Sequence, residues 1–124
     1  MNNPGLIKAF TASGVIAPYR IAKFGSADTA VLQAAAATDA MIGVIGPFGP
    51  ASGERVDVIM SGLAEIEYGG TVTRGDLLTS DSSGRAVTAA PSAGANVRII
   101  GIAMNSGVIS DIGSVFILPT QTQG

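Results

Sequence analysis

The sequence predicts an all-β fold, a small β-barrel or β-tulip-like domain with short hairpins, an extended N-terminal arm and little or no helix. Ile and Val greatly outnumber Leu, and Thr is common, a balance that favours strands over helices. Seventeen glycines are spaced along the 124 residues and separate many short β-prone runs. From Glu54 to Tyr68, apolar and polar residues alternate with the period of two that is typical of a half-buried strand.

Residues 1–18 are predicted to form the N-terminal arm, ahead of a β domain over residues 19–119. Turn formers open the arm in NNPG and interrupt it again in TASG. Between them LIKAF is apolar enough to dock on another surface, so Leu6, Ile7 and Phe10 are candidate contacts with a partner or a second subunit. A deletion of Met1 to Thr11 is therefore expected to leave the domain folded.

The first part of the β domain is expected to contain strands broken by loops. PYRIAKFG reads as a strand that ends at Gly25. The run from Thr29 to Gly46 reads as two strands joined by a turn near Thr38 and Asp39, with a helical turn over residues 35–40 as the alternative. Two prolines and three glycines make residues 46–53 a loop with Phe48 at its tip.

The alternating stretch places Val56, Val58, Ala64, Ile66 and Tyr68 on one face. Its regularity continues across a central Ser-Gly pair. Either one long strand bends at Gly62, or two strands meet there at a tight corner.

The second half is predicted to be a hairpin followed by two strongly apolar strands. LLTS and RAVTAA form the hairpin around the loop DSSG, in which Gly84 supplies a positive φ. VRIIGIAMN is apolar on both faces after Arg98, which indicates a central strand or a subunit contact. SVFILP has the same character and is expected to end at Pro119, so that residues 120–124 form a polar tail.

The composition argues against several classes of function. Cys and His are absent, which removes disulfides, thiol nucleophiles and imidazole bases, so we expect no catalytic, metal or cofactor site. The net charge is −2 and the seven basic residues are scattered, so no direct nucleic-acid or membrane contact is expected. No signal peptide or apolar 18-residue run is apparent. Hydrophobic residues make up 47% and charged residues 13%, which favours burial of apolar surface against other subunits or a partner.

Three short motifs are interpreted as structural. Glu65 and Glu67 lie on one face of a strand, about 7 Å apart by strand rise, but no third group converges on them, so a solvated or interfacial face is favoured over acid–base chemistry. The tripeptide Arg74 to Asp76 matches an adhesion motif and is interpreted as an ordinary turn. DSSG lacks the further acids of a calcium loop.

Three aromatic residues, Phe10, Tyr19 and Phe48, are the candidates for exposed interface anchors. Such anchors would suit the apolar excess, since aromatic residues are enriched at interfaces. A place in the core is the equal alternative for each.

Three blocks of glycine-and-apolar pattern together span about residues 19–119. The central block is GERVDVIMSGLAEIEYGGTVTRGDLLTSDSSGRAV. The block before it is IAKFGSADTAVLQAAAATDAMIGVIG, and the block after it is NVRIIGIAMNSGVISDIGSVFILP. In pattern and in order, the three blocks resemble the capsid cement (head decoration) proteins of tailed bacteriophages.

The resemblance implies a structural virion protein rather than an enzyme. Such a protein would be a homotrimer at threefold or local threefold positions on the outside of the expanded head, reached from the host cytoplasm during assembly. There it would bind the major capsid protein and stabilise contacts between its subunits against DNA pressure. The alternative is a β-barrel accessory module that binds a small ligand or protein partner in a bacterial cell. A hydrolase that uses Glu65 and Glu67 is a third, poorer reading.

Overall fold

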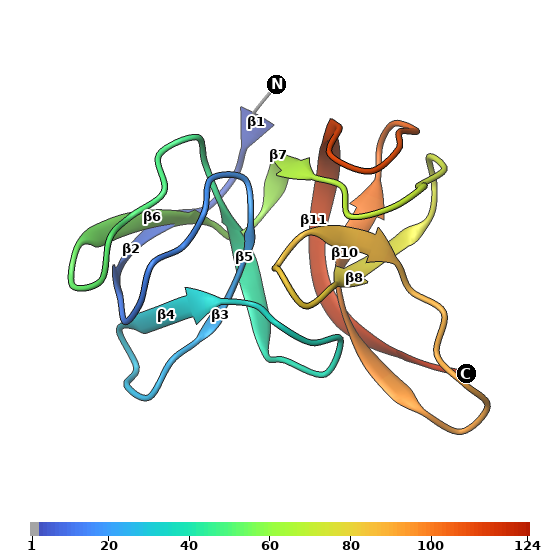
Figure 1. The fold of residues 1–124 in the computed structure, drawn as a ribbon, viewed down its shortest axis with the longest axis horizontal. Coiled ribbons are helices and arrows are strands. Elements are labelled where there is room, and N and C mark those ends of the chain that lie inside the picture. Colours follow the sequence, from blue (N-terminus) through green and yellow to red (C-terminus); the bar gives the residue numbers. More distant parts are fainter. Residues whose placement is uncertain (1–2) are drawn as a thin grey trace.

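The computed structural model describes residues 3–124, and over that range it contains eleven β-strands and no helix (Figure 1). Five of the strands close into a barrel and the other six form a separate sheet. The all-β prediction is therefore confirmed. No helix of the described chain has the length and apolar character needed to cross a membrane.

The barrel uses strands from the first half of the chain. Its strand order is β2-β4-β3-β5-β6, and β6 pairs back with β2. All neighbours are antiparallel except β2 and β4, which run parallel. The strands are β2 (Ile7–Ala12), β3 (Ile21–Phe24), β4 (Ala30–Gln33), β5 (Met41–Ile45) and β6 (Arg55–Ile59).

The six-stranded sheet is antiparallel throughout, in the order β1-β7-β11-β10-β8-β9. Its strands, apart from the short β1, come from the second half of the chain. They are β1 (Asn3–Pro4), β7 (Gly62–Glu67), β8 (Leu77–Ser80), β9 (Ala86–Thr88), β10 (Asn96–Ala103) and β11 (Ile112–Gln123).

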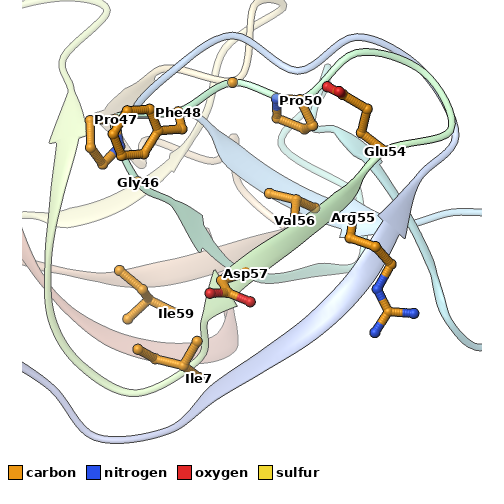
Figure 2. A pocket seen from close by; sticks show the side chains of 11 residues that line it. Ile7, Gly46, Pro47, Phe48, Pro50, Glu54, Arg55, Val56, Asp57 and Ile59 are labelled. Carbon is orange, nitrogen blue, oxygen red and sulfur yellow. The ribbon is translucent and has the colours of Figure 1, made fainter.

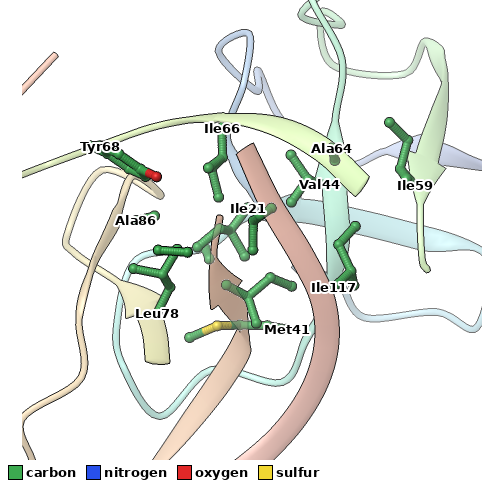
Figure 3. Packing of buried hydrophobic residues seen from close by; sticks show 14 of the residues in the cluster. Ile21, Met41, Val44, Ile59, Ala64, Ile66, Tyr68, Leu78, Ala86 and Ile117 are labelled. Carbon is green, nitrogen blue, oxygen red and sulfur yellow. The ribbon is translucent and has the colours of Figure 1, made fainter. Parts of the chain in front are cut away.

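Two hydrophobic cores follow from this arrangement. The barrel core fills the barrel interior and includes Phe10, Val31 and Val58. The interface core joins the outside of the barrel to the inner face of the sheet, with Ile21 and Val44 on the barrel side (Figure 3). All five residues of β5 are buried because this strand lies between the two cores. Its uninterrupted apolar run, MIGVI, is the sequence signature of a strand buried on both faces.

Several strand predictions are confirmed. Residues 30–45 form two strands with a turn between them and no helix. The alternating stretch is two strands, β6 in the barrel and β7 in the sheet, with Gly62 at the corner at a φ of +84°. The hairpin around DSSG pairs β8 with β9, and Gly84 has the expected positive φ. β10 is a central strand between β11 and β8.

The N-terminal segment differs from the predicted arm. Five residue pairs join β2 to β6, so residues 7–12 are an integral strand of the closed barrel. Phe10 of LIKAF and the following Ala12 point into the barrel core, whereas Leu6 and Ile7 remain exposed. The first two residues of the predicted arm lie outside the described residues.

The end of the chain also differs from the prediction. β11 does not stop at Pro119 but continues to Gln123, paired with β10 from Thr120 onward. Ile99 pairs with Thr120 while Gly101 pairs with Ile117, so β11 has one extra residue there, a β-bulge around Leu118 and Pro119. β11 pairs with β7 only as far as Ile117, so the bulge lies where one side of β11 has no β7 partner, and proline is tolerated at such a bulge.

Candidate interaction surface

A groove of about 550 Å³ lies on the barrel between the β5–β6 loop and the face of β6. Figure 2 shows Pro47 and Phe48 along one side of the groove and Ile7 and Ile59 along the other, with Asp57 beside this second pair. Ile7 and Ile59 are directly paired residues of β2 and β6. The groove is therefore a mainly apolar hollow with a few polar groups at its rim, the composition common in binding sites.

The loop that carries Phe48 is held by three hydrogen bonds to the end of β2 and the segment between β2 and β3. The Tyr19 N–H donates to the Gly46 carbonyl at 3.1 Å, the Ile16 N–H to Pro50 at 3.1 Å, and the Gly53 N–H to Ala12 at 2.7 Å. These bonds hold the loop while the Phe48 side chain stays 87% exposed. A fixed backbone that presents an exposed aromatic ring loses little conformational entropy when a partner covers the ring.

The charged groups at the groove do not form a catalytic arrangement. Glu54 accepts a hydrogen bond from the Ala51 N–H at 2.6 Å, which ties its carboxylate to the loop. Over residues 3–124 no three His, Cys, Asp or Glu side chains gather closely enough to hold a metal ion. The clear pKa shifts, at Asp39 and Tyr68, lie outside the groove.

The structure brings some of the predicted contact residues together and separates others. Ile7 and Phe48 both line the groove, and Leu6, next to Ile7, is 55% exposed. Phe10 is 2% exposed in the barrel core, with its ring centroid 6.4 Å from that of Phe24, so it is not an exposed anchor. Tyr19 is half-buried at a φ of +61° and does not line the groove.

In the three motifs interpreted as structural, acidic side chains form ion pairs or hydrogen bonds within the protein. Glu67 forms ion pairs with Arg20 and Arg85. Asp81 accepts bonds from the N–H groups of Ser83 and Arg85, which closes the DSSG loop. In the Arg-Gly-Asp turn the Asp76 carboxylate accepts the Thr73 N–H and the Thr88 hydroxyl, and Gly75 has a φ of +93°.

A second apolar surface lies on the face of the six-stranded sheet that points away from the barrel. We call it the outer apolar face. It consists of Leu63, Leu77, Ile102, Ile112, Phe116 and Leu118. The sequence signal for it was the apolar character of both faces of the last two strands, which suggested a subunit contact without showing which side chains take part.

Comparison with known proteins places this β-rich, groove-bearing chain among structural proteins of phage heads. Residues 5–110 match the model of the phage cement protein family, and the chain belongs to that family. Its role is structural and capsid-associated, and its location is the virion. The predicted resemblance is confirmed.

The fold is also that of a solved phage structure. The N base of the head fiber gp8.5 of bacteriophage phi29 superposes with a TM-score of 0.69 at 16% sequence identity, covering 96% of this chain and 98% of that one. At this identity the likeness establishes the fold. A search of curated proteins finds no matching sequence.

Proposed function

We propose that the protein binds the outer surface of the expanded icosahedral head and stabilises contacts between major capsid protein subunits against the pressure of packaged DNA. Membership of the phage cement family supports a capsid partner. The anchored loop that exposes Phe48 beside an apolar groove is the observation that supports a specific contact surface. Many identical weak contacts, one for each bound copy, add up to a large stabilisation of the shell.

In this proposal the protein acts as a homotrimer at threefold or local threefold positions, and it joins the head from the host cytoplasm during assembly. It has no enzymatic activity of its own. The absence of His and Cys and the commitment of Glu67 to two arginines support a purely mechanical role. Family membership argues against the alternative of a cellular ligand-binding module.

Co-sedimentation with capsid shells tests this function. The purified protein is mixed with expanded, undecorated shells of its own phage and, separately, with unexpanded shells. We expect saturable binding to the expanded shells alone. Binding to neither kind of shell would contradict the proposal.

Two variants locate the contact. Phe48→Ala should weaken binding to expanded shells at least tenfold, since aromatic anchors commonly supply more than about 1.4 kcal/mol at an interface. Met104→Ala is the control, because Met104 is also exposed (51%) but does not line the groove. Equal binding by both variants would remove the groove from the contact while leaving the capsid role intact.

A further inference from the structure

The barrel closes between β5 and β6 over two residue pairs, those of Val58 and Ile59. The first three residues of β6, 55–57, pair with β2 and not with β5. At the end of β5 the chain turns toward Tyr19, whose N–H donates to the Gly46 carbonyl at 3.1 Å. The groove lies in the space that this divergence leaves beside the first half of β6.

The hydrogen bonds between β2 and β6 determine which way the backbone groups of β6 point. The Ala12 N–H donates to the Glu54 carbonyl at 2.8 Å, and the Met60 N–H donates to the Leu6 carbonyl at 2.8 Å. The residue pairs between these two bonds are regular. Antiparallel strands exchange hydrogen bonds at every second pair. The even-numbered residues of β6 therefore bond to β2, and the odd-numbered residues direct their N–H and C=O groups to the opposite side.

Two of these odd-numbered residues, Arg55 and Asp57, have no strand on that opposite side, whereas Ile59 pairs with β5. Within the described residues, no backbone hydrogen bond joins either N–H to the β5–β6 loop. Unpaired N–H and C=O groups along a strand edge are a template for another strand. This edge is short and both side chains are charged, features that limit indiscriminate pairing.

The groove has the dimensions of an extended segment. It follows β6 from Glu54 to Ile59, which is about 16 Å at the rise of a β-strand. A strand added to β6 would lie about 4.8 Å from it, between β6 and the side of the groove that Pro47 and Phe48 form (Figure 2). The volume of about 550 Å³ is thus bounded by an open strand edge on one side and apolar side chains on the other.

The charges at the groove favour a basic occupant. Asp57 lines the groove, and no ion pair of the described chain includes it. The neighbouring Glu54 carboxylate accepts the Ala51 N–H at 2.6 Å. Figure 2 shows the Arg55 side chain extending away from Phe48. Opposite charges on directly paired strands attract each other, so a Lys or Arg side chain opposite Asp57 would complete the site.

We infer that the groove is a strand-addition site for an extended segment of the major capsid protein. The segment carries a basic residue opposite Asp57 and apolar residues against Phe48, and it hydrogen-bonds to the backbone of Arg55 and Asp57. The inference rests on the proposed function, since it takes the capsid protein as the partner. In this mode of recognition main-chain hydrogen bonds supply affinity, and side chains at alternate positions supply specificity.

Amide hydrogen exchange, resolved to single residues, tests the inference. In the free protein the amides of Arg55 and Asp57 should exchange at least about tenfold faster than those of Val56 and Val58, which bond to β2. On expanded shells the two fast amides should slow to the rates of their neighbours. Unchanged fast exchange in shell-bound protein would overturn the inference and leave the capsid role intact. Slowing in free protein as its concentration rises would identify a second copy as the occupant and would also overturn it.

Two variants of Asp57 separate the main-chain bond from the charge. Asp57→Asn keeps the N–H and should weaken shell binding about two- to fivefold, the effect of an exposed ion pair. Asp57→Pro also removes the N–H, and β6 should tolerate proline where that N–H is outside the ladder. Its binding should be weaker by about a further three- to tenfold. Asp28→Asn, the same charge change at an exposed residue outside the groove, should bind like the wild type. Equal binding by the two Asp57 variants would exclude the main-chain bond.

A peptide probe gives a result without shells and without a variant that has to fold. The capped peptide acetyl-Leu-Val-Lys-Val-Leu-amide should slow exchange at Arg55 and Asp57, and the same peptide with Glu in place of Lys should do so more weakly. Equal effects of the two peptides, or none, would overturn the inference. Peptide protection in a protein that binds no shell would refute the capsid proposal and with it the assigned occupant, whereas shell binding without protection of the edge overturns this inference alone.

Discussion

The guanidinium of Arg20 donates to the Glu67 carboxylate at 3.3 Å and joins the barrel to the sheet. The same guanidinium donates to the Ser83 carbonyl at 3.0 Å, and the Glu67 N–H donates to the Tyr19 carbonyl at 3.0 Å. Arg20 precedes β3 of the barrel, and Glu67 ends β7 of the sheet. This polar link at the edge of the interface core fixes how the two halves sit against each other.

Replacement of Glu67 by Gln should destabilise the fold. The change leaves the half-buried guanidinium of Arg20 without its carboxylate, while Arg85 loses one of its two carboxylates and keeps Asp81 at 3.1 Å. Removal of one partner of such a pair costs about 1–3 kcal/mol. Urea unfolding measures the loss. Asp28→Asn removes the same charge from an exposed position and should change stability by less than about 0.5 kcal/mol. Equal effects of the two variants would exclude a structural role for the link.

Replacement of Gly62 by Val should damage the corner between β6 and β7. Gly62 has a φ of +84°, a conformation that costs residues with a Cβ roughly 1–2 kcal/mol and β-branched residues more. We expect the melting temperature to fall by about 5 °C or more. Gly70→Val is the control, because the nearest atom to its added Cβ is 4.0 Å away and its φ is not positive. An unchanged melting temperature for Gly62→Val would contradict a strained corner.

Replacement of Gly113 by Ala should displace the ring of Tyr68. The ring is fully buried and lies directly on the backbone of Gly113, where an added Cβ would overlap Cζ and the hydroxyl. That hydroxyl donates to the Asn105 carbonyl at 2.7 Å. Overpacking together with a lost hydrogen bond should cost about 2–4 kcal/mol.

The comparison for this variant is Tyr68→Phe, which removes only the hydroxyl and should cost about 1 kcal/mol. Denaturant unfolding of both proteins gives the difference. If Gly113→Ala had the same free energy of unfolding as the wild type, the Tyr68 ring would have room to move. The close packing of Tyr68 on Gly113 would then not contribute to stability, and the prediction would be wrong.

The sequence predicted most of the strands, and two of its candidate contact residues, Ile7 and Phe48, line the groove. Local pattern was sufficient for β6 and β7, where alternation and one glycine mark both strands and the corner between them. It was not sufficient for residues 7–12, because a short apolar run next to turn formers looks the same whether it docks on a partner or closes its own barrel. The pairing of β2 with β6 joins residues about fifty positions apart, which no local pattern reveals.

The same limit explains the outcome for the aromatic candidates. Phe10 and Phe48 both stand in short apolar stretches near turns, yet the first fills the barrel core and the second is 87% exposed. Phe10 is buried because β2 pairs with β6 and closes the barrel, and this pairing joins residues that are far apart in the sequence. The end of β11 was wrongly predicted at Pro119 for a related reason, since proline usually ends a regular central strand but is tolerated at a bulge, which depends on the pairing with β10.

Deletion of residues 1–11 should unfold the barrel rather than leave a folded domain without an arm. It removes almost all of β2, and with it the partner of β6 and the Phe10 side chain of the barrel core. Loss of a large buried aromatic side chain alone costs about 3–5 kcal/mol. Circular dichroism and proteolysis should show an unfolded or readily cleaved chain. A cooperative melt near that of the wild type would show that β2 is dispensable.

The stability of the protein should fall in acid because of Asp39. Burial alone would raise the pKa of this carboxyl. The N–H groups of Ala35 and Ala36, at 2.8 and 3.0 Å, and the Lys23 ammonium, at 3.2 Å, outweigh burial and lower the pKa below its ordinary value of 3.8. A carboxyl with a depressed pKa stabilises the fold above its unfolded pKa, and this contribution is lost as the pH falls through its folded pKa.

The urea midpoint measured from about pH 5 to pH 2 should therefore decline more steeply for the wild type than for Asp39→Asn, which is already without the charge at every pH. Asp28→Asn should retain the wild-type slope, since Asp28 is exposed. Parallel acid curves for all three proteins would mean that the turn between β4 and β5 gains nothing from the ionised carboxylate. A flatter curve for Asp39→Asn alone would identify that turn as an acid-sensitive element next to β5, the strand shared by both cores.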